Sequence, residues 1–447
     1  LGSGWSIGDN KAVCDGSDGV NMFQNGVIEN LKKYKISFSI LNYVSGFLNG
    51  RIGSANSNDF TVSSDGNYSF NITSDGTNLI FRSSSFNGSI TNISVIEIIG
   101  DKPRIDYSDS STEPSLLLEP QTTNLITYSS DFSGYIKSEI NIVSNIATSP
   151  DGTVNATSLT NTSTGQAHIR TSFVAASTGN YTGTSYIKKQ DFDFIYVEFG
   201  NAFCWFNISN GTLGNSGNFG SGWTFISHSI ESVGNDWYRI SITANNTITG
   251  TYNFRPYQPT SANASYTSGS LGNSFIWGVQ VEQNSYATSY IPTSGSTATR
   301  LGETANNAGG AGVFNSEEGV LYAEIAALAD DGTYRQILLH DNAYNNRIAL
   351  RYMPSSNEIN VYLINGTVQV TLYYNLSNAL DFNKLAFKYK ENDFALWVNG
   401  IEVGTDTSGT TFSANTLQKI DFDFTNNYFF YGKTKNLQVF NYALTDE

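Results

Sequence analysis

Two pairs of aspartates have a spacing that glycan chemistry could use. Asp421 and Asp423 alternate with large apolar residues, and Asp191 and Asp193 repeat the Asp-Phe-Asp-Phe arrangement. Residues two apart on a strand point to one face and are about 6.8 Å apart, within the roughly 5 to 9.5 Å between the carboxyl groups of a glycoside hydrolase. The alternative is that each pair lies on a solvated sheet face, or that one member helps to bind calcium. Cleavage of a glycan is therefore the lesser hypothesis for these residues.

The other reactive side chains are isolated in the sequence. His168, His228 and His340 stand alone, so a zinc site or a Ser-His-Asp triad would need distant segments to converge. Cys14 and Cys204 lie far apart and are expected to be buried thiols rather than a disulfide. No phosphate-binding glycine-rich loop with Lys-Ser or Lys-Thr occurs. These features favour a binding protein over an enzyme.

Two tyrosines outside the alternating patterns are candidates for binding sugars, which stack on aromatic faces beside hydrogen-bonding groups. Tyr344 lies in a polar segment and is followed by Asn345, Asn346 and Arg347, which supply donors. Tyr257 lies in the segment Arg-Pro-Tyr-Gln. The alternative for both is an ordinary loop tyrosine packed on its neighbours.

Uncharged polar residues must cover most of the surface. Charged residues make up only 14% of the 447 residues, against roughly 25% in ordinary soluble domains, whereas aromatic residues reach 13%. The net charge is −15 and no basic run exceeds Lys32-Lys33 or Lys188-Lys189, so nucleic acid is excluded as a partner. Neutral glycans are the expected alternative. No apolar run approaches the ~20 residues that cross a bilayer, and we expect no membrane insertion.

Alternation of apolar and polar residues predicts antiparallel strands along the whole chain. The period of two is clear in residues 34–40, 275–281 and 394–398. Asn399-Gly400 between two alternating runs predicts a two-residue hairpin, because both central residues of a type I′ turn need a positive φ. We therefore predict an all-β chain of serial antiparallel β-sandwiches.

Two breaks in this pattern divide the chain into modules. Residues 101–123 carry three prolines among polar residues, which disfavours a central strand and indicates a connector. Residues 293–316 contain almost no large apolar side chain and are expected to form an exposed linker. The predicted modules are residues 1–100, 124–292 and 317–447.

Several blocks resemble known families. The opening segments Leu1–Asp9 and Lys11–Gly16 resemble jelly-roll carbohydrate-binding modules found in phage tail proteins. The second module looks like a block common in phage tail-fibre and minor tail proteins, and the matching segments are Leu116–Leu125, Tyr128–Phe132, Ser149–Gly152, Ile276–Glu282 and Ser285–Thr293. The third module is similar to the concanavalin A-like, laminin-G-like lectin fold through its Leu396–Gly400 hairpin and its Gly432–Thr445 segment.

The resemblance implies two jelly rolls followed by one concanavalin A-like sandwich. It implies an extracellular segment of a virion tail fibre, commonly a homotrimer, that binds bacterial host-surface glycans and other virion tail proteins. Related jelly rolls often carry a structural calcium ion, and Asp131 and Glu282 are the expected ligands here. Concanavalin-like glycanases use a Glu-rich cluster, which neither aspartate pair completes. A structural spacer or decoration of the virion, a glycan depolymerase and a secreted bacterial adhesin are the alternatives.

Overall fold

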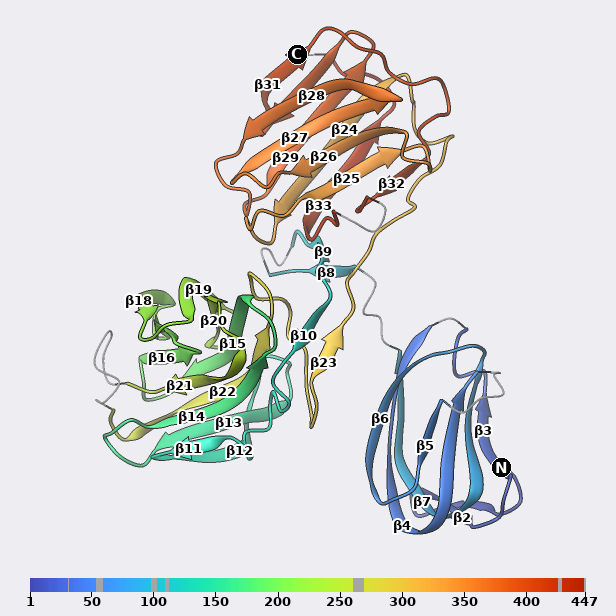
Figure 1. The fold of residues 1–447 in the computed structure, drawn as a ribbon, viewed down its shortest axis with the longest axis vertical. Helices are drawn as coiled ribbons and strands as arrows, with labels where there is room; N and C mark the ends of the chain where they lie inside the picture. Colours follow the sequence, from blue (N-terminus) through green and yellow to red (C-terminus); the bar gives the residue numbers. More distant parts are fainter. Residues whose placement is uncertain are drawn as a thin grey trace. The chain divides into compact units, whose positions relative to one another are not determined.

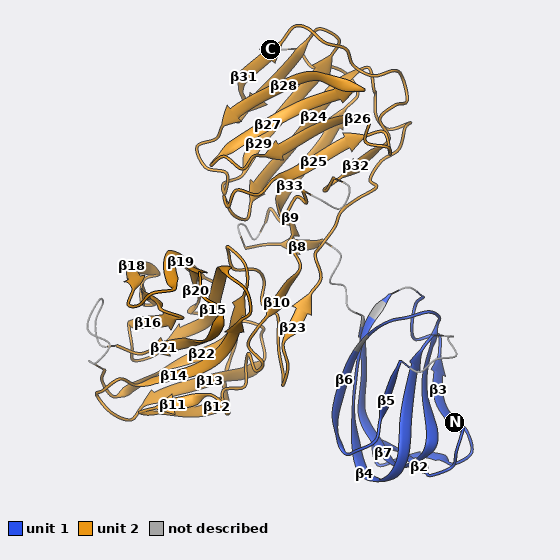
Figure 2. Ribbon diagram, in the orientation of Figure 1, with its two compact units in different colours: residues 1–100 blue, residues 101–447 orange. Residues whose placement is uncertain are grey.

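The computed structural model describes residues 1–30, 32–53, 59–97, 103–108, 112–259, 269–424 and 428–445. Every regular element in these ranges is a β-strand, and the strands pair antiparallel (Figure 1). None of the described residues forms a helix that could cross a membrane. The chain divides into two compact units, Leu1–Gly100 and Asp101–Glu447 (Figure 2). The predicted all-β class with antiparallel sheets is confirmed.

The first unit is one antiparallel sheet that folds around its own core. Its strands are β1 (Trp5–Gly8), β2 (Lys11–Asp15), β3 (Asn21–Asn25), β4 (Lys33–Ile52), β5 (Phe60–Val62), β6 (Gly66–Thr73) and β7 (Asn78–Glu97). The long strands β4 and β7 pair with three register shifts. Phe60 of β5 stacks on Phe70 of β6 with ring centroids 4.5 Å apart, although β5 and β6 pair with opposite ends of β4. The two halves of the bent β4–β7 ribbon therefore face each other, and their core includes Trp5 and Cys14, of which Cys14 was expected to be buried.

The second unit contains two sandwiches. The first of them has sheets of order β11-β14-β21-β16-β17-β18 and β12-β13-β22-β15-β20-β19. Its strands are β11 (Ile136–Ser138), β12 (Ile140–Thr148), β13 (Val154–Asn161), β14 (His168–Ala175), β15 (Gly179–Lys189), β16 (Phe194–Phe199), β17 (Ala202–Asn207), β18 (Thr212–Asn218), β19 (Trp223–Ser232), β20 (Trp237–Asn246), β21 (Gly250–Tyr257) and β22 (Gly272–Glu282). Cys204 and Trp223 belong to its core.

The C-terminal sandwich has sheets of order β31-β30-β29-β24-β33-β9-β8 and β28-β27-β26-β25-β32. Its strands are β8 (Arg104–Asp106), β9 (Ser115–Leu118), β24 (Glu318–Ala327), β25 (Arg335–His340), β26 (Asn346–Tyr352), β27 (Glu358–Asn365), β28 (Thr367–Asn375), β29 (Asn383–Lys390), β30 (Phe394–Val398), β31 (Ile401–Asp406), β32 (Lys419–Asp421) and β33 (Gly432–Phe440). The predicted hairpin joins β30 to β31, with φ of 51° at Asn399 and 83° at Gly400.

The expectation that residues 101–123 contain no interior strand is wrong. Strand β9 pairs on one side with β33 and on the other with β8, and Leu118 is buried in the C-terminal core. The prolines do not prevent this, because Pro114 and Pro120 lie just outside the four residues of β9. The C-terminal sandwich therefore begins before the sandwich of β11–β22, which is inserted between β9 and β24.

Residues 293–316, expected to be an exposed linker, are largely held by partners elsewhere in the chain. Their strand β23 (Ala298–Arg300) pairs with β10 (Thr122–Asn124), and Glu303 and Phe314 are buried. The segment lacks a core of its own, as its composition indicates, but it uses the cores and hydrogen bonds of the two sandwiches that it joins. We call the paired strands β10 and β23 the neck of the inserted sandwich.

Three of the segments that look like tail-protein blocks meet at this neck, namely Leu116–Leu125, Ile276–Glu282 and Ser285–Thr293. Thr122 donates a hydrogen bond to the buried carboxylate of Glu282 at 3.1 Å. The buried Asn124 side chain donates to the carbonyls of Val279 and Ile291 at 3.3 and 2.9 Å. Buried polar side chains need such partners, so these blocks have a structural role in tying the two ends of the inserted sandwich together.

An ionic cluster closes the neck on the side of the C-terminal sandwich. The main-chain amide of Glu303 donates to the carbonyl of Glu119 at 3.0 Å. Arg104 of β8 binds both carboxylates, with 2.5 Å from its Nε to Glu303 Oε1, and Arg300 of β23 contacts Glu119 at 2.8 Å. Two carboxylates and two guanidinium groups thus connect the C-terminal sheet with the two segments that lead into and out of the inserted sandwich.

Candidate functional site

Tyr344 is held over the outer face of the five-stranded sheet β28-β27-β26-β25-β32. Its backbone has φ of 61°, which is rare for a tyrosine. Its ring stacks on His340 with centroids 4.3 Å apart, and its hydroxyl donates to Asp421 at 3.2 Å. Its carbonyl accepts a hydrogen bond from Arg347. The loop that the sequence selected is therefore fixed on a sheet surface, with Asn345 exposed at its tip.

The Asn346 side chain stabilises this loop from within. Its Nδ2 donates to Asp341 Oδ2 at 2.8 Å, and its Oδ1 accepts from the amide of Gly366 at 3.1 Å. Three of the four predicted residues, Tyr344, Asn346 and Arg347, are thus engaged in intramolecular bonds. The Arg347 guanidinium also takes part in a larger arrangement of arginine and aromatic side chains on the same sheet face.

Two arginines contact the ring of Tyr362 on this face. The guanidinium carbon of Arg347 lies 5.5 Å from the Tyr362 centroid and that of Arg351 lies 4.7 Å from it. Arg347 also lies 4.9 Å from the Phe424 ring, and Arg351 lies 5.1 Å from the Tyr334 ring. Each arginine is therefore placed between two aromatic faces, a geometry that cation–π attraction favours.

Tyr428 closes the arrangement into a ring. Its centroid lies 5.1 Å from that of Tyr334 and 6.4 Å from that of Phe424. We call these six side chains the guanidinium–aromatic ring: Phe424, Arg347, Tyr362, Arg351, Tyr334 and Tyr428. Tyr428 is 45% exposed, whereas Tyr362 is buried, so the surface that a ligand could contact is formed by the rim of the ring.

An aromatic hollow lies beside the ring and shares Tyr334 and Tyr428 with it. Its volume is about 450 Å³, and Tyr286, Phe429 and Tyr431 also line it. Burial raises the pKa of Tyr431 to about 12, so its hydroxyl remains a hydrogen-bond donor at neutral pH. Exposed ring edges with hydroxyl groups are suited to stacking and hydrogen bonding with a saccharide.

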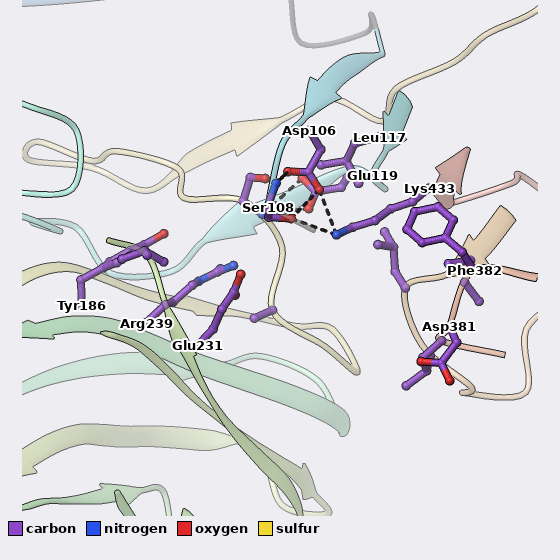
Figure 3. A pocket seen from close by; sticks show the side chains of 17 residues that line it. Asp106, Ser108, Leu117, Glu119, Tyr186, Glu231, Arg239, Asp381, Phe382 and Lys433 are labelled. Carbon is purple, nitrogen blue, oxygen red and sulfur yellow. Dashed lines mark hydrogen bonds and ion pairs between the residues drawn. The ribbon is translucent and has the colours of Figure 1, made fainter. Parts of the chain in front are cut away.

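A second hollow, of about 530 Å³, lies between the inserted and C-terminal sandwiches (Figure 3). The inserted sandwich contributes Tyr186, Glu231 and Arg239. On the other side Lys433 contacts Asp106 at 2.9 Å. Charges of both signs line this space and partly satisfy each other. Sequence reasoning missed both hollows, because their residues come from segments that only the neck brings together.

The second candidate, Tyr257, does not offer a stacking surface. It lies at the end of β21 with 3% of its surface exposed. Its hydroxyl accepts from Arg255 at 2.9 Å and donates to Glu198 at 3.1 Å, and His168 and Tyr196 flank its ring. The alternation of the strand continues to this residue, so Tyr257 packs on the outer face of its sheet.

The calcium site at Asp131 and Glu282 stays a prediction. Asp131 is exposed and accepts from the amide of Ser133 at 2.9 Å, which lowers its pKa. Both oxygens of the buried Glu282 already accept hydrogen bonds, among them two from Thr288 at 2.8 and 2.7 Å. Within the described ranges, no group of three or more His, Cys, Asp or Glu side chains could hold a metal ion.

The aspartate pairs are engaged in structural bonds. Asp421 is buried, against the expectation of a solvated face, and lies 2.8 Å from Nε2 of His340. The amide of Asn342 donates to Nδ1 of that histidine at 3.2 Å, so its Nε2 carries the proton. Asp423 is also buried and accepts from Asn306 at 2.9 Å. In the other pair, Asp191 is exposed.

Comparison with known families gives the class of the C-terminal sandwich. Residues 323–447 match the concanavalin A-like lectin/glucanases superfamily. The C-terminal domain is concanavalin A-like. The match begins within β24, so β8 and β9 are strands of the concanavalin A-like domain that lie outside the matched segment. Comparison with curated protein sequences found no match.

Several solved structures are also similar to this chain. Sheep galectin-11 in complex with glycerol is 11% identical, covers 24% of this chain and 84% of its own, and gives a TM-score of 0.20. Domains LG4-5 of the mouse laminin α1 chain are 11% identical, with 72% and 91% coverage and a TM-score of 0.24. The LG1-3 region of the laminin α2 chain is 9% identical, with 95% and 96% coverage and a TM-score of 0.24. Such low values carry no functional information.

Proposed function

We propose that this chain is a glycan-binding segment of a bacteriophage tail appendage and that it contacts host-surface saccharides through its concanavalin A-like domain. The observation that carries the proposal is the guanidinium–aromatic ring, which places exposed aromatic edges and arginine donors on one sheet face of a lectin-type fold. The adjoining aromatic hollow of about 450 Å³ has room for one or two sugar residues.

The assignment to a virion tail is supported by the resemblance of the neck segments to tail-fibre and minor tail proteins. Display as a homotrimer would suit this role, because several weak saccharide contacts on one particle combine into strong attachment. Other virion tail proteins would then be the chain's structural partners. The composition agrees with an extracellular setting, since the surface is polar and carries few lysines and arginines.

Binding without cleavage is the mode that we propose. The His340–Asp421 pair is the one histidine–carboxylate contact among the described ion pairs, but it is buried beneath Tyr344. General acid catalysis needs a carboxyl group within hydrogen-bond reach of the substrate. A depolymerase is therefore the weaker alternative. If host polysaccharide did release reducing ends with the chain, Asp421→Asn should abolish the release.

An array of bacterial surface polysaccharides tests the proposal. The full chain should be retained on at least one saccharide, and Tyr428→Ala should reduce retention about tenfold because it removes the most exposed member of the ring. Tyr442→Ala is the matched control, since Tyr442 is 57% exposed and does not belong to the ring. Absence of retention on every saccharide, with the chain presented in several copies, would support a structural spacer instead.

A further inference from the structure

Resting on this proposed function, we infer that the guanidinium–aromatic ring selects acidic saccharides, whose carboxylate or sulfate group binds at Arg351. Charge composition pointed to neutral glycans, because the chain as a whole is acidic. Recognition depends on the local donors and acceptors, however, and around Arg351 the unused groups are donors.

Arg351 has donors to spare. Its Nε donates to Asn360 Oδ1 at 2.5 Å. Among the described residues, its two terminal nitrogens have no protein hydrogen bond and no carboxylate partner. Arg347 likewise has no carboxylate partner there, although it donates to the Tyr344 carbonyl. By contrast, Arg104, Arg255, Arg300 and Arg335 each pair with a carboxylate.

Two buried amides flank Arg351 and also lack acceptors. The strand register places Gln336 and Asn360 directly opposite Arg351 on the neighbouring strands. Gln336 is 1% exposed and Asn360 is fully buried, and Gln336 Nε2 and Asn360 Nδ2 have no hydrogen-bond partner. The orientation of Asn360 is fixed, because a guanidinium can only donate and therefore requires its oxygen. A buried donor without an acceptor is energetically unfavourable.

An anionic oxygen would pair with the terminal nitrogens of Arg351 better than a hydroxyl group would. Carboxylate and sulfate groups offer several acceptor lone pairs and no donor, and a guanidinium binds them in a bidentate manner. The aromatic faces around Arg347 and Arg351 hold the two cations beside one another, so less side-chain freedom is lost when the ligand binds. A neutral sugar has no such group to offer and would leave the charge of Arg351 unpaired.

Matched ligands separate this inference from the proposed function. The full chain is applied to an array of uronate-containing and sulfated polysaccharides, together with the same uronates after carboxyl reduction and the same sulfated polymers after desulfation. We expect retention on at least one acidic polymer, a loss of tenfold or more after neutralisation, and weaker binding at 1 M than at 0.1 M salt. The two acidic classes distinguish carboxylate from sulfate.

Substitutions test whether Arg351 is responsible for the preference for acidic saccharides. Arg351→Gln should lower affinity for the acidic ligand at least tenfold, and Arg351→Lys should restore only part of it, because the charge returns without the bidentate geometry. Lys384→Gln, an equal charge change at an exposed residue of β29, should have no effect. Thermal unfolding of each variant checks its fold. Equal binding of acidic and neutral forms with Tyr428 still required would overturn the inference but keep the proposed function, whereas no retention at all would overturn both.

Discussion

Removal of the Glu303 carboxylate should loosen the neck of the inserted sandwich. Glu303 is 1% exposed and accepts from Arg104 Nε at 2.5 Å and from the amide of Glu119 at 2.8 Å. Truncation of one member of a buried ion pair costs about 3–5 kcal/mol. Arg104 keeps Glu119 as a partner and its side chain is 37% exposed, so water can solvate it. We therefore expect Glu303→Ala to destabilise the second unit by about 3 kcal/mol.

Calorimetry measures this effect. A loss of about 3 kcal/mol in the free energy of unfolding should lower the melting temperature of the second unit by roughly 6 °C, and the melting temperature of the first unit should not change. Glu303→Gln should destabilise the second unit less than Glu303→Ala, because one oxygen acceptor remains. Glu391→Ala is the control, since Glu391 lies exposed between β29 and β30. A melting temperature of Glu303→Ala within 1 °C of the parent would refute the view that the ionic cluster joins the two sandwiches.

Three further predictions concern buried positions. Burial raises the pKa of Glu282 above its ordinary 4.5, against opposing hydrogen bonds. Its contribution to the free energy of unfolding is therefore present below pH 4.5 and is lost as the pH rises through the raised pKa. Glu282→Gln should flatten this fall in the free energy of unfolding, measured by urea unfolding from pH 4 to 7. Gly50→Ala should destabilise the first unit by about 1–3 kcal/mol, because a Cβ there would lie 1.8 Å from the Phe60 ring, whereas Gly8→Ala, with open space around it, should change the unfolding midpoint little. Burial raises the pKa of the Cys204 thiol well above its usual value, so iodoacetamide should label it in urea but not in the native protein, and rapid native labelling would contradict its place in the core.

The sequence could predict the site only in part. Tyr344 and Arg347 were found because an aromatic residue and a cation stand out in a polar loop. Arg347 belongs to the guanidinium–aromatic ring, and Tyr344 lies beside it, with its centroid 5.3 Å from that of Phe424. Arg351, Tyr362 and Tyr334 were not found. Arg351 and Tyr362 occupy regular strand positions, where alternation says which face a side chain takes but not what lies opposite it.

The sequence by itself determined the local structure of this protein. The period of two predicted the strands, and Asn399-Gly400 predicted a hairpin, because these features depend on residues close together in the chain. The tertiary structure decided which distant segments meet. It placed residues of 101–123 and 293–316 in one neck and made the inserted sandwich an interruption of the concanavalin A-like domain. Such pairings depend on the complementarity of edges far apart in sequence, which no local pattern encodes.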